Sequence, residues 1–314
     1  MAKIIALANQ KGGVSKTTSS LNICYSFAQK GRKALLIDFD SQGSSSLNLG
    51  IDVASDEINT IEELLVKFMD DPKSITYEDV KPYIYKPTFE TNERIEGTTK
   101  WQRVNKEFGF DVIPASLNLA TVEMQMMLRG GRTVSGKAYP FYLRDICKVL
   151  NDKYDFIVID TAPSLSYLSI NAMCASTSGI IVPSNLDIMS FRGIGSFIDT
   201  ANEAVQIAKN AKEEHRGILG VLLSLYSERR TVDNALARYI IDFYPVPVFK
   251  TRIIDSSDAK KANASMLLFS QVNKKAKACF DNLTTEIEEA INYPDKWKQE
   301  AKDTYMQTKQ EEGE

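Results

Sequence analysis

Short apolar runs alternate with longer amphipathic stretches along most of the chain. The apolar runs predict strands near residues 3–8, 33–38, 111–113, 155–160, 179–183, 217–224 and 246–249. Apolar residues at helical spacing predict helices near 16–30, 115–129, 140–152, 164–176, 190–213, 230–243 and 270–291. Strands that alternate with helices are typical of a mostly parallel, doubly wound sheet with helices on both faces. The pattern therefore predicts an α/β fold.

One segment interrupts this alternation. Residues 52–110 have mixed polarity and carry several prolines, and two helices are predicted within them, at Ile58–Phe68 and Tyr77–Tyr85. We interpret the segment as a long surface insertion after the second strand. It is either a decoration particular to this protein or a contact for a partner or a second subunit, and the sequence leaves both open.

The turn after the first strand carries the most specific chemistry in the chain. A strand, a Gly-bearing turn and a helix start form a cradle of backbone N–H groups for phosphate oxygens. Lys16 can reach the terminal phosphates, and the Thr17 hydroxyl can ligate Mg²⁺. The strict pattern G-x-x-x-x-G-K-[ST] is not met, because Gln10 and Ser15 occupy its glycine positions. The predicted nucleotide-binding residues are Lys11, Gly12, Gly13, Val14, Ser15, Lys16, Thr17 and Thr18.

A second lysine, Lys11, stands at the front of this turn. An ordinary strand-to-helix connection is the alternative interpretation of any Gly-rich turn. Two cations that bracket Gly12 and Gly13 repel each other unless an anion lies between them, so the pair favours a bound phosphate.

Three carboxylates end apolar strands. Asp38 and Asp40 close the second predicted strand, and Asp160 closes the fourth. In open α/β sheets, ligands bind beyond the carboxyl ends of the strands, which is also where Gly12 lies. Asp160 is placed to hold Mg²⁺ through water, although a strand-end Asp can also cap the next helix.

Composition limits the possible partners. The net charge is −3, so any DNA binding must come from a local basic patch. Cys24, Cys147, Cys174 and Cys279 lack metal or redox spacing and are expected to be buried, reduced thiols of a cytoplasmic protein. The single histidine, His215, is expected at a solvated helix end. No signal peptide or apolar run long enough for a membrane span is present.

Four separate motifs resemble the ParA/MinD/Soj family of ATPases. Residues 9–18 are similar to its deviant Walker A loop, K-G-G-V-G-K-T-T, and residues 34–43 resemble L-L-I-D-x-D-P-Q-G. Residues 111–116 resemble D-x-I-P-A-S, and residues 156–164 resemble the Walker B run I-I-I-D-T-P-P-S. The matches keep the family's order, cover most of residues 1–285 and favour the ParA branch, whose members partition chromosomes and plasmids.

The resemblance implies a P-loop NTPase fold and hydrolysis of ATP with Mg²⁺. It assigns the metal to Thr17 and Asp160 with Asp38 nearby, and catalysis to Asp40, which orients water, with Lys11 and Lys16. In the family, the lysine matching Lys11 reaches across a dimer interface to the partner's phosphates. A lysine that binds its own subunit's phosphates stays open as an alternative.

Three residues depart from the family pattern. Ser15 replaces a glycine and must hold a backbone angle that a non-Gly residue tolerates. Ser41 and Ala162 replace prolines in the segments after the second and fourth strands. None of the three changes removes a charged or ligating group.

The resemblance further implies an ATP-bound homodimer, nonspecific DNA binding in the nucleoid, no membrane binding, and a ParB-type centromere-binding partner that stimulates hydrolysis. Adenine contacts are expected near Tyr226 and Thr251–Ile254. No helix-turn-helix pattern precedes the first strand, which disfavours binding to a specific operator. The predicted DNA patch comprises Arg229, Arg230, Arg238, Lys250, Arg252, Lys260, Lys261, Lys274, Lys275 and Lys277.

Other functions fit the sequence less well. A MinD-like positioning ATPase is the main alternative and would need a basic amphipathic C-terminal helix. Residues 291–314 form instead a polar tail after an ATPase domain at 1–290, and Lys298–Glu314 is expected to be a frayed helix or disordered. An iron–sulfur reductase relative lacks suitably placed cysteines, a tyrosine kinase lacks a C-terminal tyrosine cluster, and a non-hydrolysing binding module would not need the catalytic carboxylates.

Overall fold

A six-stranded parallel sheet forms the centre of the molecule. The computed structural model describes residues 1–55, 57–70, 75–96, 98–129, 139–185, 188–226, 242–244 and 246–311. The strands are β1 (Lys3–Leu7), β2 (Ala34–Phe39), β5 (Asp111–Ile113), β6 (Phe156–Thr161), β7 (Gly179–Asn185) and β8 (Ile218–Ser224). Their order is β5-β2-β6-β1-β7-β8, and every neighbouring pair is parallel. The predicted fold class is confirmed.

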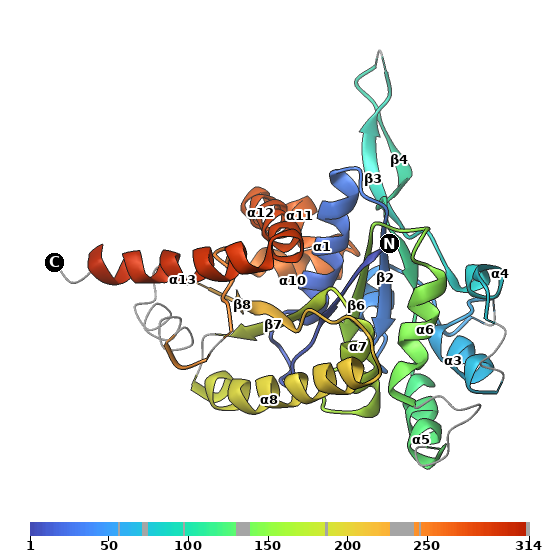
Figure 1. Cartoon of the computed structure of the whole chain (residues 1–314). Helices are drawn as coiled ribbons and strands as arrows, with labels where there is room; N and C mark the ends of the chain where they lie inside the picture. Colours follow the sequence, from blue (N-terminus) through green and yellow to red (C-terminus); the bar gives the residue numbers. More distant parts are fainter. Residues whose placement is uncertain are drawn as a thin grey trace.

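Helices cover both faces of this sheet (Figure 1). One layer contains α1 (Lys16–Gln29), α11 (Phe269–Val272) and α12 (Lys274–Asn292). The other layer contains α3 (Ile61–Asp70), α5 (Leu119–Arg129), α6 (Tyr142–Val149), α7 (Tyr167–Ala175) and α8 (Ile188–Asn210). The shorter helices are α2 (Ser44–Asn48), α4 (Tyr77–Val80), η1 (Lys81–Tyr83), η2 (Tyr139–Phe141) and α10 (Ser257–Ala264).

The continuous apolar runs arise because each central strand is buried on both faces. In β1, Ile5 and Leu7 join the core cluster under α1 and α12. Ile4 and Ala6 point the other way and join the cluster under α3, α6 and α7. Side chains alternate in this way along every strand, so both helix layers pack on apolar surface.

The segment 52–110 is only partly a surface insertion. Helix α3 contributes Ile61, Leu64, Leu65, Phe68 and Met69 to the core, all of them buried. The prediction that the whole segment lies on the surface is therefore wrong for α3, which crosses over the sheet between β2 and β5. The remainder contains an antiparallel hairpin of β3 (Thr88–Arg94) and β4 (Trp101–Glu107), which projects from the body in Figure 1.

The predicted strand at residues 246–249 is not present in the sheet. Residues 246–249 form no sheet strand: Val248 makes one isolated bridge to Val221. Pro247 has no N–H group and so cannot continue a ladder of hydrogen bonds. The predicted helix at 230–243 lies outside the described residues for positions 230–241.

The polar tail begins as a packed helix. Helix α13 spans Pro294–Glu311 and follows α12 after one residue. Trp297 is buried, lies against Phe249 with 5.2 Å between ring centroids, and donates a hydrogen bond from Nε1 to the Leu219 carbonyl at 3.1 Å. Ala301 is also buried. The first turns of the tail thus pack against the edge of the domain.

Candidate functional site

The turn between β1 and α1 has the backbone of a phosphate-binding loop. Ser15 precedes the helix with φ 64° and ψ 25°, in the left-handed region, and Gly13 has φ 72°. A non-glycine residue in this region costs about 1–2 kcal/mol. Ser15 therefore adopts the left-handed conformation that a glycine would adopt in this loop, but at an energetic cost. The first N–H groups of α1 have no partners within the helix and can meet an anion.

Hydrogen bonds to β7 and α8 support this loop. Asn9 donates to the Pro183 carbonyl at 2.7 Å, and Asn185 donates to the Gly13 carbonyl at 3.0 Å. The Gln10 side chain donates to the Gly193 carbonyl at 3.2 Å. Gln10, which replaces a motif glycine, thus has a structural function. Asn185 was not predicted from the sequence, because no local motif marks it.

Lys16 is buried inside the loop. Its side-chain ammonium donates to the Lys11 carbonyl at 2.8 Å, and only 6% of the residue is exposed. Burial lowers the pKa of Lys16, while the nearby carboxylates of Asp160 and Asp40 raise it. A desolvated ammonium of this kind is stabilised by an anion, which is what bound phosphates would supply. Lys11 is half-buried, with its backbone N–H donated to Asn9 Oδ1 at 3.0 Å.

Three hydroxyl groups surround the carboxylate of Asp160. Ser20 donates to Oδ1 at 3.0 Å, Ser45 donates to Oδ2 at 2.8 Å, and the Thr17 hydroxyl also bonds to this carboxylate. Burial raises the pKa of Asp160 to about 6, although these hydrogen bonds lower it. Ser20 and Ser45 were not predicted from the motifs. The run Ser44 to Ser46 directly after the Asp40 motif was the available signal.

The donor set fits magnesium. Thr17 and Asp160 offer hard oxygen ligands side by side, at the mouth of a loop suited to phosphates. Within the described residues, no group of three or more His, Cys, Asp or Glu side chains could hold a metal alone. Mg²⁺ characteristically binds through one or two protein oxygens, water and substrate phosphates, so a protein-only cage is not required.

Asp38 and Asp40 occupy different environments at the end of β2. Asp38 is fully buried and accepts hydrogen bonds from the Ser46 N–H and hydroxyl at 2.8 and 2.7 Å. Burial and the charge of Asp160 raise the pKa of Asp38 to about 8. Asp40 accepts from the Gln42 N–H at 2.9 Å and acts electrostatically on both Lys16 and Asp160. The structure thus brings all three predicted carboxylates to the loop.

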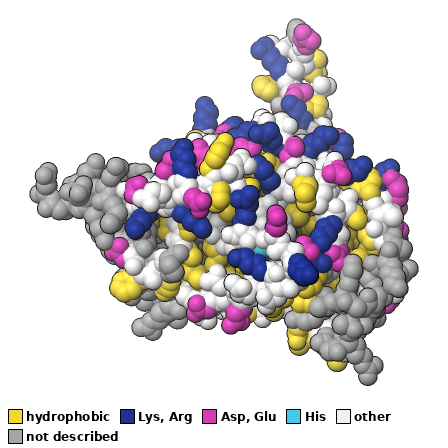
Figure 2. Space-filling view, viewed as in Figure 1, with side chains coloured by type: hydrophobic (Ala, Val, Ile, Leu, Met, Phe, Trp, Pro, Cys, Tyr) yellow, Lys and Arg dark blue, Asp and Glu magenta, His cyan; other side chains and the backbone are white. Residues whose placement is uncertain are grey.

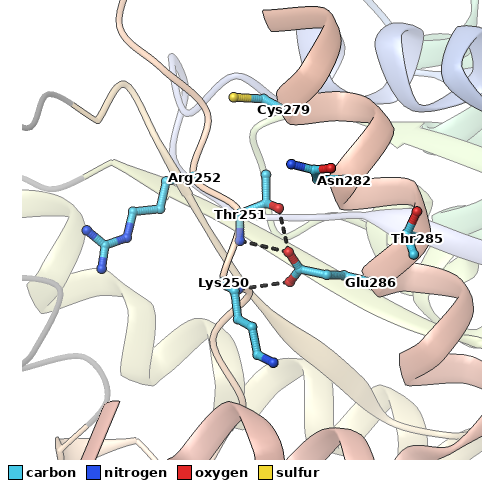
Figure 3. Close-up of a pocket in the computed structure, with 7 residues that line it drawn as sticks. All are labelled: Lys250, Thr251, Arg252, Cys279, Asn282, Thr285 and Glu286. Atoms are coloured by element: carbon cyan, nitrogen blue, oxygen red, sulfur yellow. Dashed lines mark hydrogen bonds between the residues drawn. The ribbon is translucent and has the colours of Figure 1, made fainter. Parts of the chain in front are cut away.

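The predicted adenine region lies beyond β8. Tyr226 pairs with Ile254 in an isolated parallel bridge, and Arg252 stacks on the Tyr226 ring at 4.5 Å from its centroid. Figure 3 shows the adjoining cavity of about 480 Å³, where Glu286 of α12 accepts hydrogen bonds from the N–H groups of Lys250 and Thr251. Burial raises the pKa of Glu286. This carboxylate fastens the loop to α12.

The predicted DNA-binding residues are only partly brought together. Lys260 and Lys261 lie on α10, and Lys274, Lys275 and Lys277 lie on α12. The Asn273 side chain, at the start of α12, donates to Asp258 of α10 at 2.9 Å and so joins the two helices. Lys261 pairs with Asp258, and Lys277 pairs with Asp281. Lys250 approaches Glu300 at 3.7 Å. Arg229, Arg230 and Arg238 lie outside the described residues.

His215 does not lie at a solvated helix end, so that prediction is wrong. The residue is buried in the loop between α8 and β8, where Nε2 contacts the Met173 carbonyl at 2.8 Å and Nδ1 accepts from the Gly217 N–H at 2.9 Å. Its neighbours in sequence are charged, but its two ring nitrogens are used by backbone groups. Cys24, Cys147 and Cys174 are buried thiols, whereas Cys279 is half-buried.

The sequence and structure match known proteins. Residues 2–214 match the family model described as AAA domain. The chain is 29% identical to the sporulation initiation inhibitor protein Soj of Bacillus subtilis, over 90% of this chain and 96% of that protein. It is 26% identical to the chromosome partitioning protein ParA of Myxococcus xanthus, over 89% and 84% of the two chains.

A solved structure supports the same fold. Cobyrinic acid a,c-diamide synthase from Mycobacterium smegmatis, with bound ADP and magnesium, superposes with a TM-score of 0.70 at 24% identity, over 94% of this chain and 97% of that one. The chain belongs to the AAA domain family, as a ParA/MinD-type ATPase. Among the described residues of this ATPase, no helix is both long and apolar enough to span a bilayer.

Proposed function

We propose that this ATPase partitions DNA in a nucleotide-dependent cycle. Mg-ATP drives two copies into a sandwich dimer that binds DNA without sequence preference. ATP hydrolysis, stimulated by a ParB-type centromere-binding partner, separates the copies and releases the DNA. The replicon or chromosome would thereby be segregated in the cytoplasm, on the nucleoid.

The main support for this proposal is that residues of the phosphate loop contact the carboxylates at the ends of the neighbouring strands. The Lys16 ammonium is buried, and Thr17, next to it, shares Asp160 with two serines. Phosphate oxygens bound at the start of α1, beside the Lys16 side chain, would compensate the ammonium charge. The structurally similar cobyrinic acid a,c-diamide synthase noted above contains ADP and magnesium, in support of the same ligands here.

The residues of this chain divide the catalytic work. Mg²⁺, held by Thr17 and through water by Asp160, would neutralise charge on the β- and γ-phosphates. Lys16 would stabilise the same charge from inside the loop. Asp40 is assigned to orient the attacking water, because it lies at the end of β2 close enough to influence Lys16 and Asp160. Asp38 positions the following segment through its bonds to Ser46.

Dimer formation is supported by an exposed apolar surface. On and just before α5, the residues Leu117, Met124, Met127 and Leu128 have more than half of their surface exposed. Leu165, in the loop after β6, is 43% exposed. Exposed apolar side chains in such numbers are characteristic of protein–protein contacts. Lys11 would complete the dimer by reaching the phosphates bound by the other copy.

Nonspecific DNA binding is assigned to the lysines of α10 and α12. Lys260, Lys274 and Lys275 are exposed, and no ion pair involving them occurs in the described part of the chain. A dimer doubles the number of phosphate contacts, and the affinity would fall steeply as the salt concentration rises. The packing of α13 argues against membrane association, since its described apolar residues Trp297 and Ala301 are buried in the domain.

An electrophoretic mobility shift on unrelated duplex DNA tests the proposal. We expect a shift with Mg-ATP and none with Mg-ADP or without nucleotide. The variant Asp40→Ala should hold ATP without turnover and keep the shifted species for longer. Equal shifts in all three nucleotide states, or normal ATP turnover by Asp40→Ala, would contradict the cycle or the role of Asp40, respectively.

A further inference from the structure

A second cavity lies at the amino ends of the strands, on the opposite side of the sheet from the phosphate loop. It has a volume of about 890 Å³ and is lined by residues at the amino ends of β1, β7 and β8, with the ends of α6, α8 and α12. The phosphate loop follows the carboxyl end of β1, so the length of that strand separates the two sites. Figure 2 looks onto this side of the molecule, where Lys and Arg side chains gather around the histidine.

Positive charge dominates the lining of this cavity. Its six basic side chains are Lys3, Arg144, Lys148, Lys209, Lys212 and Arg216, whereas its acidic side chains are Glu213 and Glu214. Glu213 is shared by Arg144 at 3.1 Å and Lys148 at 2.9 Å, and Asp145 lies 2.9 Å from Arg144. These carboxylates thus compensate Arg144 and Lys148, the two cations that α6 contributes to the cavity lining.

Among the described residues, three of the other cations have no carboxylate partner in an ion pair. Lys209, Lys212 and Arg216 make no ion pair within the described part of the chain, and Lys3 donates to the neutral Asn292 side chain at 2.9 Å. Lys212 also keeps a left-handed backbone, with φ 61°. Burial lowers the pKa of Lys3; the nearby carboxylates of Glu288 and Asp155 raise it, and the charges of Arg32 and Arg216 lower it further. Burial also lowers the pKa of His215, and the charge of Lys209 adds to this effect.

Neutral polar groups line the remaining wall. Thr177, Ser178 and Asn151 contribute hydroxyl and amide groups next to the cations. The Asn151 side-chain oxygen is buried without a hydrogen-bond partner. Buried polar atoms are normally paired, so this acceptor has unused capacity for a donor such as a ligand hydroxyl, an amino group or a water.

We propose that this cavity binds a small phosphorylated molecule with at least two negative charges, such as a nucleoside phosphate or a sugar phosphate. Small-ligand sites commonly measure 300–1,000 Å³, and this cavity falls within that range. Cations from β1, the α8–β8 loop and α6 line a hollow of small-ligand size, whereas a DNA duplex presents its phosphates as an extended array along its axis. The shape therefore favours a small anion over nucleic acid.

The test must separate this site from the phosphate loop, which also binds phosphates. Isothermal titration calorimetry with inorganic pyrophosphate in EDTA, on a Lys16→Ala background, removes the loop's ammonium and Mg²⁺ from the measurement. We expect binding to persist in Lys16→Ala alone. Adding Lys209→Gln, Lys212→Gln and Arg216→Gln should weaken pyrophosphate binding at least tenfold, because the three substitutions remove three positive charges from the lining of the cavity. All three residues are exposed, so their replacement leaves the core unchanged.

A matched control carries the same loss of charge elsewhere. Lys100→Gln, Lys298→Gln and Lys302→Gln, at exposed residues outside both the cavity and the proposed DNA surface, should change pyrophosphate affinity less than twofold on the Lys16→Ala background. The proposal is overturned if Lys16→Ala binds no pyrophosphate, if the cavity variant binds as tightly as its parent, or if the control loses as much affinity as the cavity variant.

Two further measurements exclude a folding defect and distinguish a small anion from nucleic acid as the ligand of the cavity. Thermal unfolding of the cavity variant within a few degrees of its parent would assign the loss of affinity to the site. With an intact Lys16, the three cavity substitutions should leave the ATP-dependent DNA shift in place. Loss of that shift with unchanged pyrophosphate binding would show that the surface serves nucleic acid and would overturn the small-ligand assignment.

Discussion

Asp38 and Asp160 lie directly opposite each other on the neighbouring parallel strands β2 and β6, and both are fully buried. The charge of Asp160 adds to burial in disfavouring the ionised form of Asp38, whereas the charge of Asp40 adds to burial at Asp160. The pKa of Asp38 is raised to about 8 and that of Asp160 to about 6. A bound cation would stabilise the charged forms of both groups. Without it, the two buried carboxyl groups lower the stability of the nucleotide-free fold.

Replacing Asp160 with Asn should stabilise the nucleotide-free protein at pH 8. An acid with a raised pKa in the folded state loses stability as the pH rises from its unfolded value, near 4, through about 6. The gain should therefore be about 1–3 kcal/mol at pH 8 and shrink towards pH 4. Thermal unfolding without Mg²⁺ at both pH values measures it, and Mg-ATP binding should be lost in the same variant.

The exposed residue Asp152 provides the control for this change. Asp152→Asn makes the same chemical substitution on the surface and should shift neither stability nor nucleotide binding. A lower melting temperature of Asp160→Asn at pH 8 would show that the hydrogen bonds from Ser20 and Ser45 outweigh the burial of charge.

Gly43→Ala should destabilise the site far more than Gly31→Ala. Both glycines have positive φ, 59° and 74°, so both substitutions place Ala in a left-handed conformation that costs about 1–2 kcal/mol. Only at Gly43 would the new Cβ lie 2.7 Å from a backbone oxygen, that of Ala115. Denaturant unfolding should show an additional loss of about 1–3 kcal/mol for Gly43→Ala. Equal losses in the two variants would exclude the steric explanation.

The fold could be predicted from local patterns where both faces of a strand are buried. The runs that became β1, β2, β6, β7 and β8 are continuous and apolar because helices cover both faces. The hairpin β3–β4 was missed because both of its faces are largely exposed, so no apolar alternation marks it. Residues 246–249 were predicted to form a strand because they are apolar, but Pro247 limits their pairing and only one isolated bridge forms.

The site could be predicted as far as its motifs extend. Lys16, Thr17, Asp38, Asp40 and Asp160 are all at the loop, as the order of the motifs implied. The supporting hydroxyls of Ser20 and Ser45 were not found, since serines carry no charge and occur throughout the chain. His215 was misplaced for the opposite reason: its charged neighbours suggested solvent, whereas a buried imidazole between two backbone groups depends on tertiary contacts.

His215 should make the protein less stable as the pH falls below about 6.5. Burial and the nearby Lys209 lower the pKa of His215 in the folded state, so the unfolded chain takes up the proton first. The neutral ring also has to accept from the Gly217 N–H, which a protonated ring cannot do. Between pH 7 and pH 5, the wild type should lose more stability than His215→Gln, as measured by urea unfolding. Parallel pH profiles for the two proteins would contradict this account.

Lys11→Ala and Lys16→Ala should separate nucleotide binding from dimer formation. Lys16 is buried in its own loop and bonds to the Lys11 carbonyl, a backbone contact that Lys11→Ala preserves. Lys16→Ala should therefore lose ATP affinity at least tenfold. Lys11→Ala should keep ATP affinity within a few fold, while sedimentation with ATP should show a monomer where the wild type forms a dimer. If the Lys11 side chain instead serves its own subunit's phosphates, both variants lose ATP affinity together. An ATP-bound dimer of Lys11→Ala would remove the role across the interface altogether.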